Sequence, residues 1–217
     1  MPEVTITTEL DMRNHWDGVY ASRSPEQVSW FQPRASTSLR LIAQSAVPAA
    51  GVAVVDIGAG ASTLTGALLD AGYDDVTLLD ISAEALDAVV RRLADRAGEV
   101  TRVQADLLTW EPGRAFDVWH DRAVFHFLRS TADIATYVDL ASRALRPGGA
   151  LVLGTFAEDG PTSCSGLSTT RYNAEQLAAV FASAFALEHT EREQHQTPQG
   201  TTQLFTWVLL RRRLVLG

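Results

Sequence analysis

The sequence lacks the residues from which several kinds of protein are built. It has a single cysteine, Cys164, which excludes an internal disulfide framework and a metal site made of several thiolates. No apolar run approaches the roughly 18 uninterrupted residues of a membrane span, and Met1 to Leu10 lacks the charged start and apolar centre of a signal peptide. We therefore expect a cytoplasmic protein that holds no metal and enters no membrane.

Positive charge is also scarce. The 18 basic residues, all of them arginine, are outnumbered by 26 acidic residues, and the formal net charge is −8. This balance repels phosphate backbones, and no basic stripe with interleaved aromatic residues offsets it. A nucleic acid is therefore not expected as a partner.

What the sequence does contain is a regular alternation of elements. From Val52 onward, apolar runs of strand length alternate with amphipathic helical stretches, which is typical of parallel βαβ units. The 217 residues, 46% of them hydrophobic, suffice for one substantial core. The expected strands are 52–57, 76–80, 100–105, 116–119 and 150–156, and the expected helices are 62–71, 83–97, 131–145 and 173–184.

The carboxyl-terminal part breaks the alternation. Leu187–Arg192 and Leu204–Leu210 read as strands without room for a helix between them, so they should pair antiparallel. The loop Ala157–Arg171 is rich in Gly, Ser, Thr and Pro and is long enough to be functional. The sequence thus predicts an α/β fold, Rossmann-like and doubly wound, mostly parallel with a carboxyl-terminal antiparallel hairpin.

Residues 1–50 are expected to form a helical cap before the main domain at 51–217. Glu9–Ala21 and Ala35–Ala46 look helical. The segment between Trp16 and Phe31 also carries Tyr20 and Trp30, an aromatic density unlike the rest of the chain. These side chains either pack in the core or close as a lid over a ligand.

Polar residues gather where the predicted parallel strands end. In an open parallel sheet the ligand binds at the carboxyl ends of the strands. Gly58 and Gly60 in "DIGAG" let a ligand approach the backbone at the start of a helix. Asp80 follows 20 residues after Gly60 and can accept both hydroxyls of a ribose, while Asp106 can accept from an adenine amino group.

Two details separate the possible adenosine ligands. A dinucleotide site would favour a third glycine where Thr63 stands and an apolar residue where Asp56 stands, because an acid beside a pyrophosphate costs energy. S-adenosylmethionine has no phosphate and carries a sulfonium and an ammonium. Acids at Asp56, Asp80 and Asp106 around one pocket suit that cation.

These segments also resemble a known family. "VVDIGAGAST", "VTLLDIS", "VQADLL", "FDVWHDRAVFHFL" and "ALRPGG" look like the ordered motifs of class I S-adenosylmethionine-dependent methyltransferases. The resemblance implies a seven-stranded sheet and S-adenosyl-L-methionine as cofactor. The residues that it places around the cofactor, with the aromatic cap, are Trp16, Tyr20, Trp30, Asp56, Gly58, Gly60, Asp80, Ile81, Asp106, Leu107 and His120.

The acceptor side is less sharply marked. Candidate catalytic residues are Asp121, Arg122 and His126 in "HDRAVFHF". Each has a structural alternative: Asp121 could cap the following turn, Arg122 could pair with a surface acid, and His126 could be a hydrogen-bonded histidine of the core. A thiol acceptor is partly ionised and needs little help, whereas an amine or alcohol needs a placed base. Weaker candidates for substrate contact are Phe31, Cys164, Arg171 and His195.

Two subfamily resemblances point to different acceptors. "WHDRAVFHFL" with "EREQHQTPQGTTQLFTWVLL" is similar to thiopurine and related thiol methyltransferases, which favours a small soft nucleophile. "HWDGVYA…SWF" instead resembles lysine methyltransferases of elongation factors, but Asp121-Arg122-Ala123 departs from their acid-lysine-glycine turn. A cofactor-binding module without turnover is a third possibility, because pocket residues alone do not prove chemistry.

Overall fold

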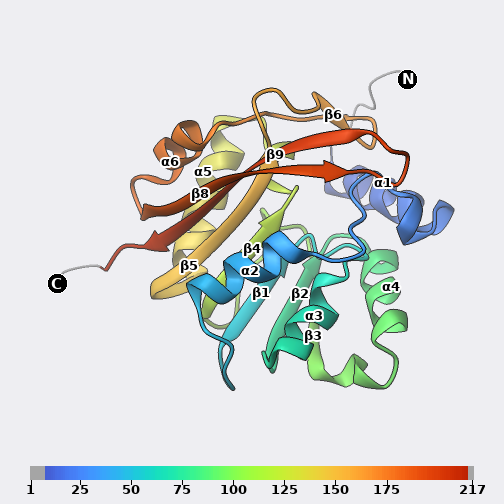
Figure 1. Ribbon diagram of the computed structural model, residues 1–217, viewed down its shortest axis with the longest axis horizontal. Coiled ribbons are helices and arrows are strands. Elements are labelled where there is room, and N and C mark those ends of the chain that lie inside the picture. Colours follow the sequence, from blue (N-terminus) through green and yellow to red (C-terminus); the bar gives the residue numbers. More distant parts are fainter. Residues whose placement is uncertain (1–7, 215–217) are drawn as a thin grey trace.

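The computed structural model describes residues 8–214, and a twisted seven-stranded sheet forms its centre (Figure 1). The strands lie in the order β3-β2-β1-β4-β5-β9-β8. Their bounds are β1 Ala53–Ile57, β2 Asp75–Asp80, β3 Val100–Gln104, β4 Phe116–Arg122, β5 Leu145–Phe156, β8 Phe185–Gln196 and β9 Thr202–Arg212. Neighbours pair parallel except for β9, which runs antiparallel to both β5 and β8. The predicted Rossmann-like sheet with its carboxyl-terminal hairpin is confirmed.

Helices cover both faces of this sheet. Leucines of α2 (Ser36–Ser45), α3 (Leu64–Ala71) and α4 (Ala83–Leu93) pack against one face, and α5 (Thr131–Ala144) and α6 (Ala174–Phe181) pack against the other. The remaining elements are α1 Glu9–Ser22, the 3-10 turns η1 Pro25–Gln27, η2 Ala94–Glu99 and η3 Phe125–Phe127, and a small ladder of β6 Ser163–Cys164 with β7 Leu167–Ser168.

The helix ends follow local chemistry. The Ser82 hydroxyl accepts from the backbone N–H of Ala85, which is the N-cap predicted for α4. Asn173 and Gln176 form a reciprocal capping box at α6. Gly72 ends α3 in the left-handed region, at φ 98°, where a side chain would be strained. These signals fix where each helix joins its strand.

Several boundaries differ from the prediction. Helix α4 ends at Leu93 and continues as the 3-10 turn η2, so the helix stops before Gly98. Strand β4 continues to Arg122, and β5 starts at Leu145, where the ladder to Phe116 shifts register through the "RPGG" segment. The predicted loop at 157–171 contains the β6–β7 ladder. For β4, β5 and the β6–β7 ladder, pairing with a neighbouring strand extends a segment that local pattern alone leaves irregular.

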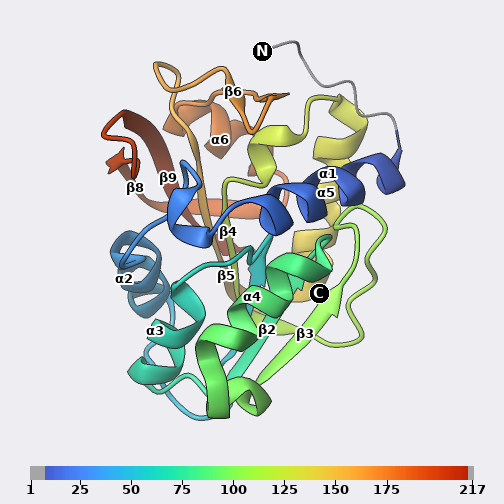
Figure 2. The ribbon, with the colours of Figure 1, turned by 90° about the vertical axis from the view of Figure 1, so that its right-hand side faces the viewer.

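Helix α1 lies across the carboxyl ends of the strands, beside α4 (Figure 2). The Ser82 hydroxyl donates to Asp17 at 2.6 Å and so ties α1 to the start of α4. The predicted cap over residues 1–50 includes residues 1–7, which lie outside the described residues. Among residues 8–214 no helix combines the length and the apolar character that crossing a membrane requires.

Candidate functional site

Two adjoining cavities lie at the carboxyl ends of the central strands. The larger encloses about 180 Å³ and the smaller about 60 Å³. Of the predicted site residues, the larger is lined by Trp16, Tyr20, Trp30, Gly58, Asp80, Ile81, Asp106, Leu107, Arg122 and Cys164. The smaller is lined by Tyr20, Trp30, Phe31, Asp56, Gly58, Gly60, His120 and Arg122. Neither is lined by Asp121, His126, Arg171 or His195.

Asp80 closes β2 at the floor of the larger cavity. Its carboxylate accepts from the backbone N–H of Gly60 at 2.7 Å and from that of Ser82 at 2.9 Å. Burial raises the pKa of Asp80 to about 6 against these two hydrogen bonds, and the charges of Asp56 and Asp17 add to the rise. The acid therefore joins the glycine loop to the start of α4, and each oxygen keeps a second lone pair for a ligand hydroxyl.

The glycine loop passes close to neighbouring side chains. Gly58 and Gly60 both have positive φ, at 59° and 54°. A Cβ at Gly58 would lie 2.1 Å from Val124 Cγ2, and one at Gly60 would lie 2.6 Å from the Tyr20 hydroxyl. Both the backbone conformation and the space thus require glycine at these positions.

Asp106 also lines the larger cavity, two residues after the end of β3. Its Oδ1 accepts from the backbone N–H of Leu108 at 2.8 Å. Ile81 and Leu107 line the same cavity. An acid in a cavity that apolar side chains also line suits a flat base that carries an amino group.

Aromatic side chains from three segments roof the larger cavity. Trp16 meets the rings of Trp30 and Phe127 edge to face, at centroid distances of 5.8 and 5.5 Å. The Trp16 indole N–H also points at the sulfur of Met12, at 3.2 Å. Met12, Trp16 and Tyr20 are spaced by four residues and share one face of α1. That spacing could have identified Met12 from the sequence, whereas Phe127 carries no comparable signal.

The smaller cavity holds a buried acid–imidazole pair. Asp56 Oδ1 and His120 Nδ1 are 2.6 Å apart, on the paired strands β1 and β4. The imidazole stacks on Trp207, with ring centroids 6.0 Å apart. The three predicted acids are thus divided, with Asp80 and Asp106 in the larger cavity and Asp56 in the smaller one. The expectation of one pocket around all three is corrected to two adjoining cavities.

Arg122 belongs to the walls of both cavities. Its Nη1 donates to the Trp30 carbonyl at 3.0 Å, and its guanidinium lies 4.6 Å from the centre of the Phe205 ring. Burial lowers the pKa of this side chain, and the charge of Glu193 partly offsets the effect.

Asp121 and His126 line neither cavity. Asp121 stands between His120 and Arg122 on β4, where successive residues face opposite sides of the sheet, and His126 lies beyond β4 in η3. The Asp121 carboxylate accepts from the backbone N–H groups of Val124 and Phe125 and from the Tyr137 hydroxyl. His126 is fully buried against Phe156, and burial lowers its pKa to about 3. Neither of these two candidate catalytic residues therefore faces a cavity in which a ligand could bind.

The remaining substrate candidates are dispersed. Cys164 lines the larger cavity, and burial raises the pKa of its thiol to about 12, so it stays protonated near neutral pH. Arg171 is exposed. His195 Nε2 lies 2.8 Å from the Ser29 carbonyl and holds the aromatic segment in place.

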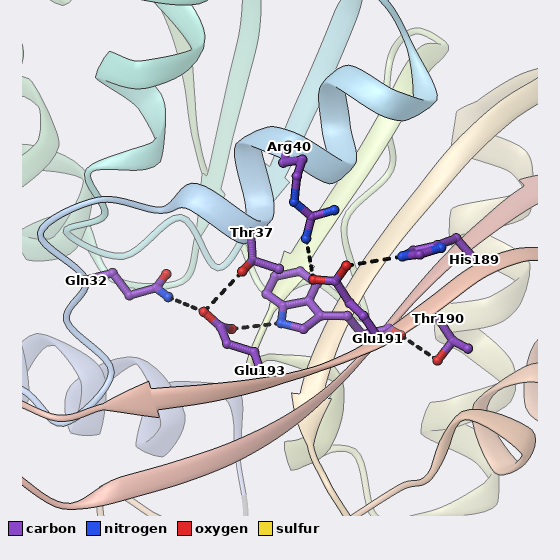
Figure 3. A network of polar contacts seen from close by, with 8 residues as sticks. Gln32, Thr37, Arg40, His189, Thr190, Glu191 and Glu193 are labelled. Atoms are coloured by element: carbon purple, nitrogen blue, oxygen red, sulfur yellow. Dashed lines mark hydrogen bonds and ion pairs between the residues drawn. The ribbon is translucent and has the colours of Figure 1, made fainter.

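A polar network fastens the amino-terminal segment to the β8–β9 hairpin (Figure 3). The Glu193 carboxylate accepts from Gln32 at 2.8 Å, from Thr37 at 3.4 Å and from the Trp207 indole at 2.8 Å. Beside it, Arg40 donates to Glu191. Gln32 also lines the smaller cavity, so the network supports the cavity wall from outside.

These features fit an adenosyl sulfonium compound better than a dinucleotide. The acids Asp80 and Asp106 share the larger cavity, where a pyrophosphate would be repelled. Asp80 can accept from ribose hydroxyls, Asp106 from an adenine amino group, and the aromatic roof can cover a sulfonium methyl. The donor set therefore agrees with S-adenosylmethionine.

Comparison with known proteins gives the same picture. Residues 54–149 match a family model described as a methyltransferase domain. Over 121 residues the chain is 31% identical to ribosomal RNA small subunit methyltransferase A of Methylobacterium radiotolerans. That match covers 42% of this chain, and the chain spans 41% of the length of that relative.

Solved structures share the fold along nearly the whole chain. An S-adenosylmethionine-dependent methyltransferase from Anabaena variabilis has a TM-score of 0.75 at 16% identity, over 98% of both chains. The N-methyltransferase NodS from Bradyrhizobium japonicum, in complex with S-adenosyl-L-homocysteine, has a TM-score of 0.71 at 18% identity, over 92% of this chain and 97% of NodS. The chain therefore has the class I methyltransferase fold, and its residues 54–149 match a methyltransferase domain.

Proposed function

We propose that the protein transfers the methyl group of S-adenosylmethionine to a small soft nucleophile, a thiol or related sulfur compound. One observation carries the choice of acceptor. No histidine is among the described residues that line the larger cavity, and its two acids, Asp80 and Asp106, are assigned to the ribose and the adenine in this proposal. A thiol ionises near neutral pH and needs no placed base, whereas an amine or alcohol does.

The residues have separable tasks in this proposal. When bound, S-adenosylmethionine supplies a methyl carbon activated by its sulfonium. Asp80 accepts hydrogen bonds from the ribose, and Asp106 accepts one from adenine. The roof of Trp16, Trp30 and Phe127 excludes water from the acceptor, and the positive charge of Arg122 favours the ionised form of a thiol. Such a displacement mainly requires that the nucleophile and the methyl carbon are aligned and that water is excluded.

A related structure lends further support. A chain described under the conversion of a disulfide bond into a thioacetal group during echinomycin biosynthesis shares the fold, with a TM-score of 0.73 at 22% identity over 93% of both chains. That description concerns sulfur chemistry. NodS and a 1,6-didemethyltoxoflavin N1-methyltransferase of Burkholderia thailandensis share the fold as well, so acceptors with nitrogen nucleophiles belong in the test.

The test is a panel of acceptors offered with methyl-labelled S-adenosylmethionine. We expect label on small thiols, with little on amines of the same size. Label on a protein band would favour a lysine methyltransferase, and label on RNA would favour the activity named for the ribosomal RNA relative. Binding of the cofactor without transfer to any acceptor would indicate a module without turnover.

A further inference from the structure

Arg122 carries an unused pair of hydrogen-bond donors. Its Nη1 group is occupied by the Trp30 carbonyl, but no described group accepts from Nε or Nη2, and both atoms are buried. In a guanidinium, Nε–H and Nη2–H point the same way and form a fork that matches the two oxygens of a carboxylate.

The described residues around the fork provide no counter-charge that satisfies it. Glu193 is the acid whose charge acts on Arg122, but its oxygens accept from Gln32, Thr37 and Trp207. Burial raises the pKa of the Cys164 thiol more than the positive charge of Arg122 lowers it, so this thiol stays neutral and supplies no counter-charge. A buried cation with two open donors is costly unless a ligand completes it.

We propose that the Arg122 fork binds a carboxylate of a ligand held in the two joined cavities, an inference that rests on the proposed function. Arg122 lines both cavities, so a carboxylate could reach it from either side. A polyphosphate is a poor fit because acids line both cavities, Asp80 and Asp106 the larger one and Asp56 the smaller one. The carboxylate belongs either to the amino-acid end of the cofactor or to the methyl acceptor.

Calorimetry on the full chain separates the two sources. S-adenosylhomocysteine and 5′-methylthioadenosine differ by the amino-acid end of the cofactor, and 2-mercaptobenzoate and thiophenol differ by a carboxylate on the acceptor. The acceptors are titrated in the presence of S-adenosylhomocysteine. The variants are Arg122→Gln, which removes the fork, and Arg122→Lys, which keeps the charge without the fork. Arg114→Gln is the matched control, because Arg114 also lies over a phenylalanine ring but lines neither cavity.

The expected loss in either variant is about 10- to 100-fold in affinity for the carboxylate-bearing ligand of one pair. The ligand of that pair without a carboxylate should bind the wild type and both Arg122 variants with the same affinity. The Arg114→Gln variant should bind every ligand like the wild type. A loss for S-adenosylhomocysteine assigns the fork to the cofactor, and a loss for 2-mercaptobenzoate assigns it to the acceptor. Equal binding across both pairs and all variants overturns the inference.

A spectroscopic measurement on the wild type needs no variant to fold. Burial lowers the pKa of His195 and the positive charge of Arg122 lowers it further, while the hydrogen bond to Ser29 and the charge of Glu193 act in the opposite sense. A carboxylate on the fork should raise the His195 pKa in an NMR titration, and the matched ligand without a carboxylate should leave it unchanged. If wild-type protein binds no S-adenosylhomocysteine, the proposed function fails. If S-adenosylhomocysteine binds but the Arg122 variants lose no affinity for a carboxylate and the His195 pKa does not change, the proposed function stands and the role of the Arg122 fork is refuted.

Discussion

Asp80 is expected to make cofactor binding depend on pH. The pKa of this carboxyl is raised to about 6, first by burial and then by the charges of Asp56 and Asp17, despite hydrogen bonds from two backbone N–H groups. A ribose donates its hydroxyl protons most strongly to the ionised carboxylate. As pH falls through 6, Asp80 takes up a proton and this acceptor weakens.

The size of the effect follows from the shift. With a pKa of about 6, roughly one tenth of the Asp80 carboxyl is ionised at pH 5, so the affinity for S-adenosylhomocysteine should fall about tenfold between pH 7 and pH 5. The folded-state pKa lies above the unfolded value of 3.8. The unliganded fold is therefore favoured by protonation, and this contribution of up to about 3 kcal/mol is lost as pH rises from 4 through 6.

Calorimetry in two buffers of different ionisation heat measures both affinity and proton release. Binding at pH 6 should release about half a proton. Asp80→Asn should bind weakly and without the pH dependence, whereas the exposed Asp70→Asn should behave like the wild type. Equal affinity at pH 7 and pH 5 would refute the role assigned to the Asp80 carboxylate.

Three further substitutions test the site. Gly58→Ala places a Cβ against Val124 in a strained backbone, so we expect a loss of about 2–5 kcal/mol in unfolding free energy, against about 1 kcal/mol for the open turn position Gly200→Ala, both measured by denaturant titration. Asp121→Ala should cost about 2–4 kcal/mol by the same method, yet bind S-adenosylhomocysteine like the wild type once folded. Trp16→Ala should weaken S-adenosylhomocysteine binding about tenfold in calorimetry because it opens the aromatic roof, and unchanged affinity would remove Trp16 from the site.

Much of the fold follows from local pattern. The apolar run that ends in Ile57, the capping serine at Ser82 and the glycine stop at Gly72 each act within a few residues, so periodicity and cap chemistry predict them. The lengths of β8 and β9 depend on pairing between segments distant in sequence. For that reason the hairpin was predicted but its extent was not.

The site residues likewise differ in how far the sequence predicts their positions. Gly58, Asp80 and Asp106 lie at strand ends, where topology alone places them. Asp121 and Arg122 are neighbours on β4 and so face opposite sides of the sheet, which is why the structure separates two residues that the sequence pattern groups at one site. The Asp56–His120 pair depends on the register between β1 and β4, and the bonds of Glu193 to Gln32 and Trp207 depend on how the amino-terminal segment packs. Neither has a signal in the sequence.

The most direct test of the central claim is transfer of a labelled methyl group from S-adenosylmethionine to a small thiol by the purified full chain, detected by mass spectrometry of the acceptor. We predict a methyl thioether and S-adenosylhomocysteine in equal amounts, with a much smaller yield from the Asp80→Asn variant. Binding of NADH in place of the sulfonium cofactor, or cofactor binding with no methylated thiol across the panel, would contradict the account.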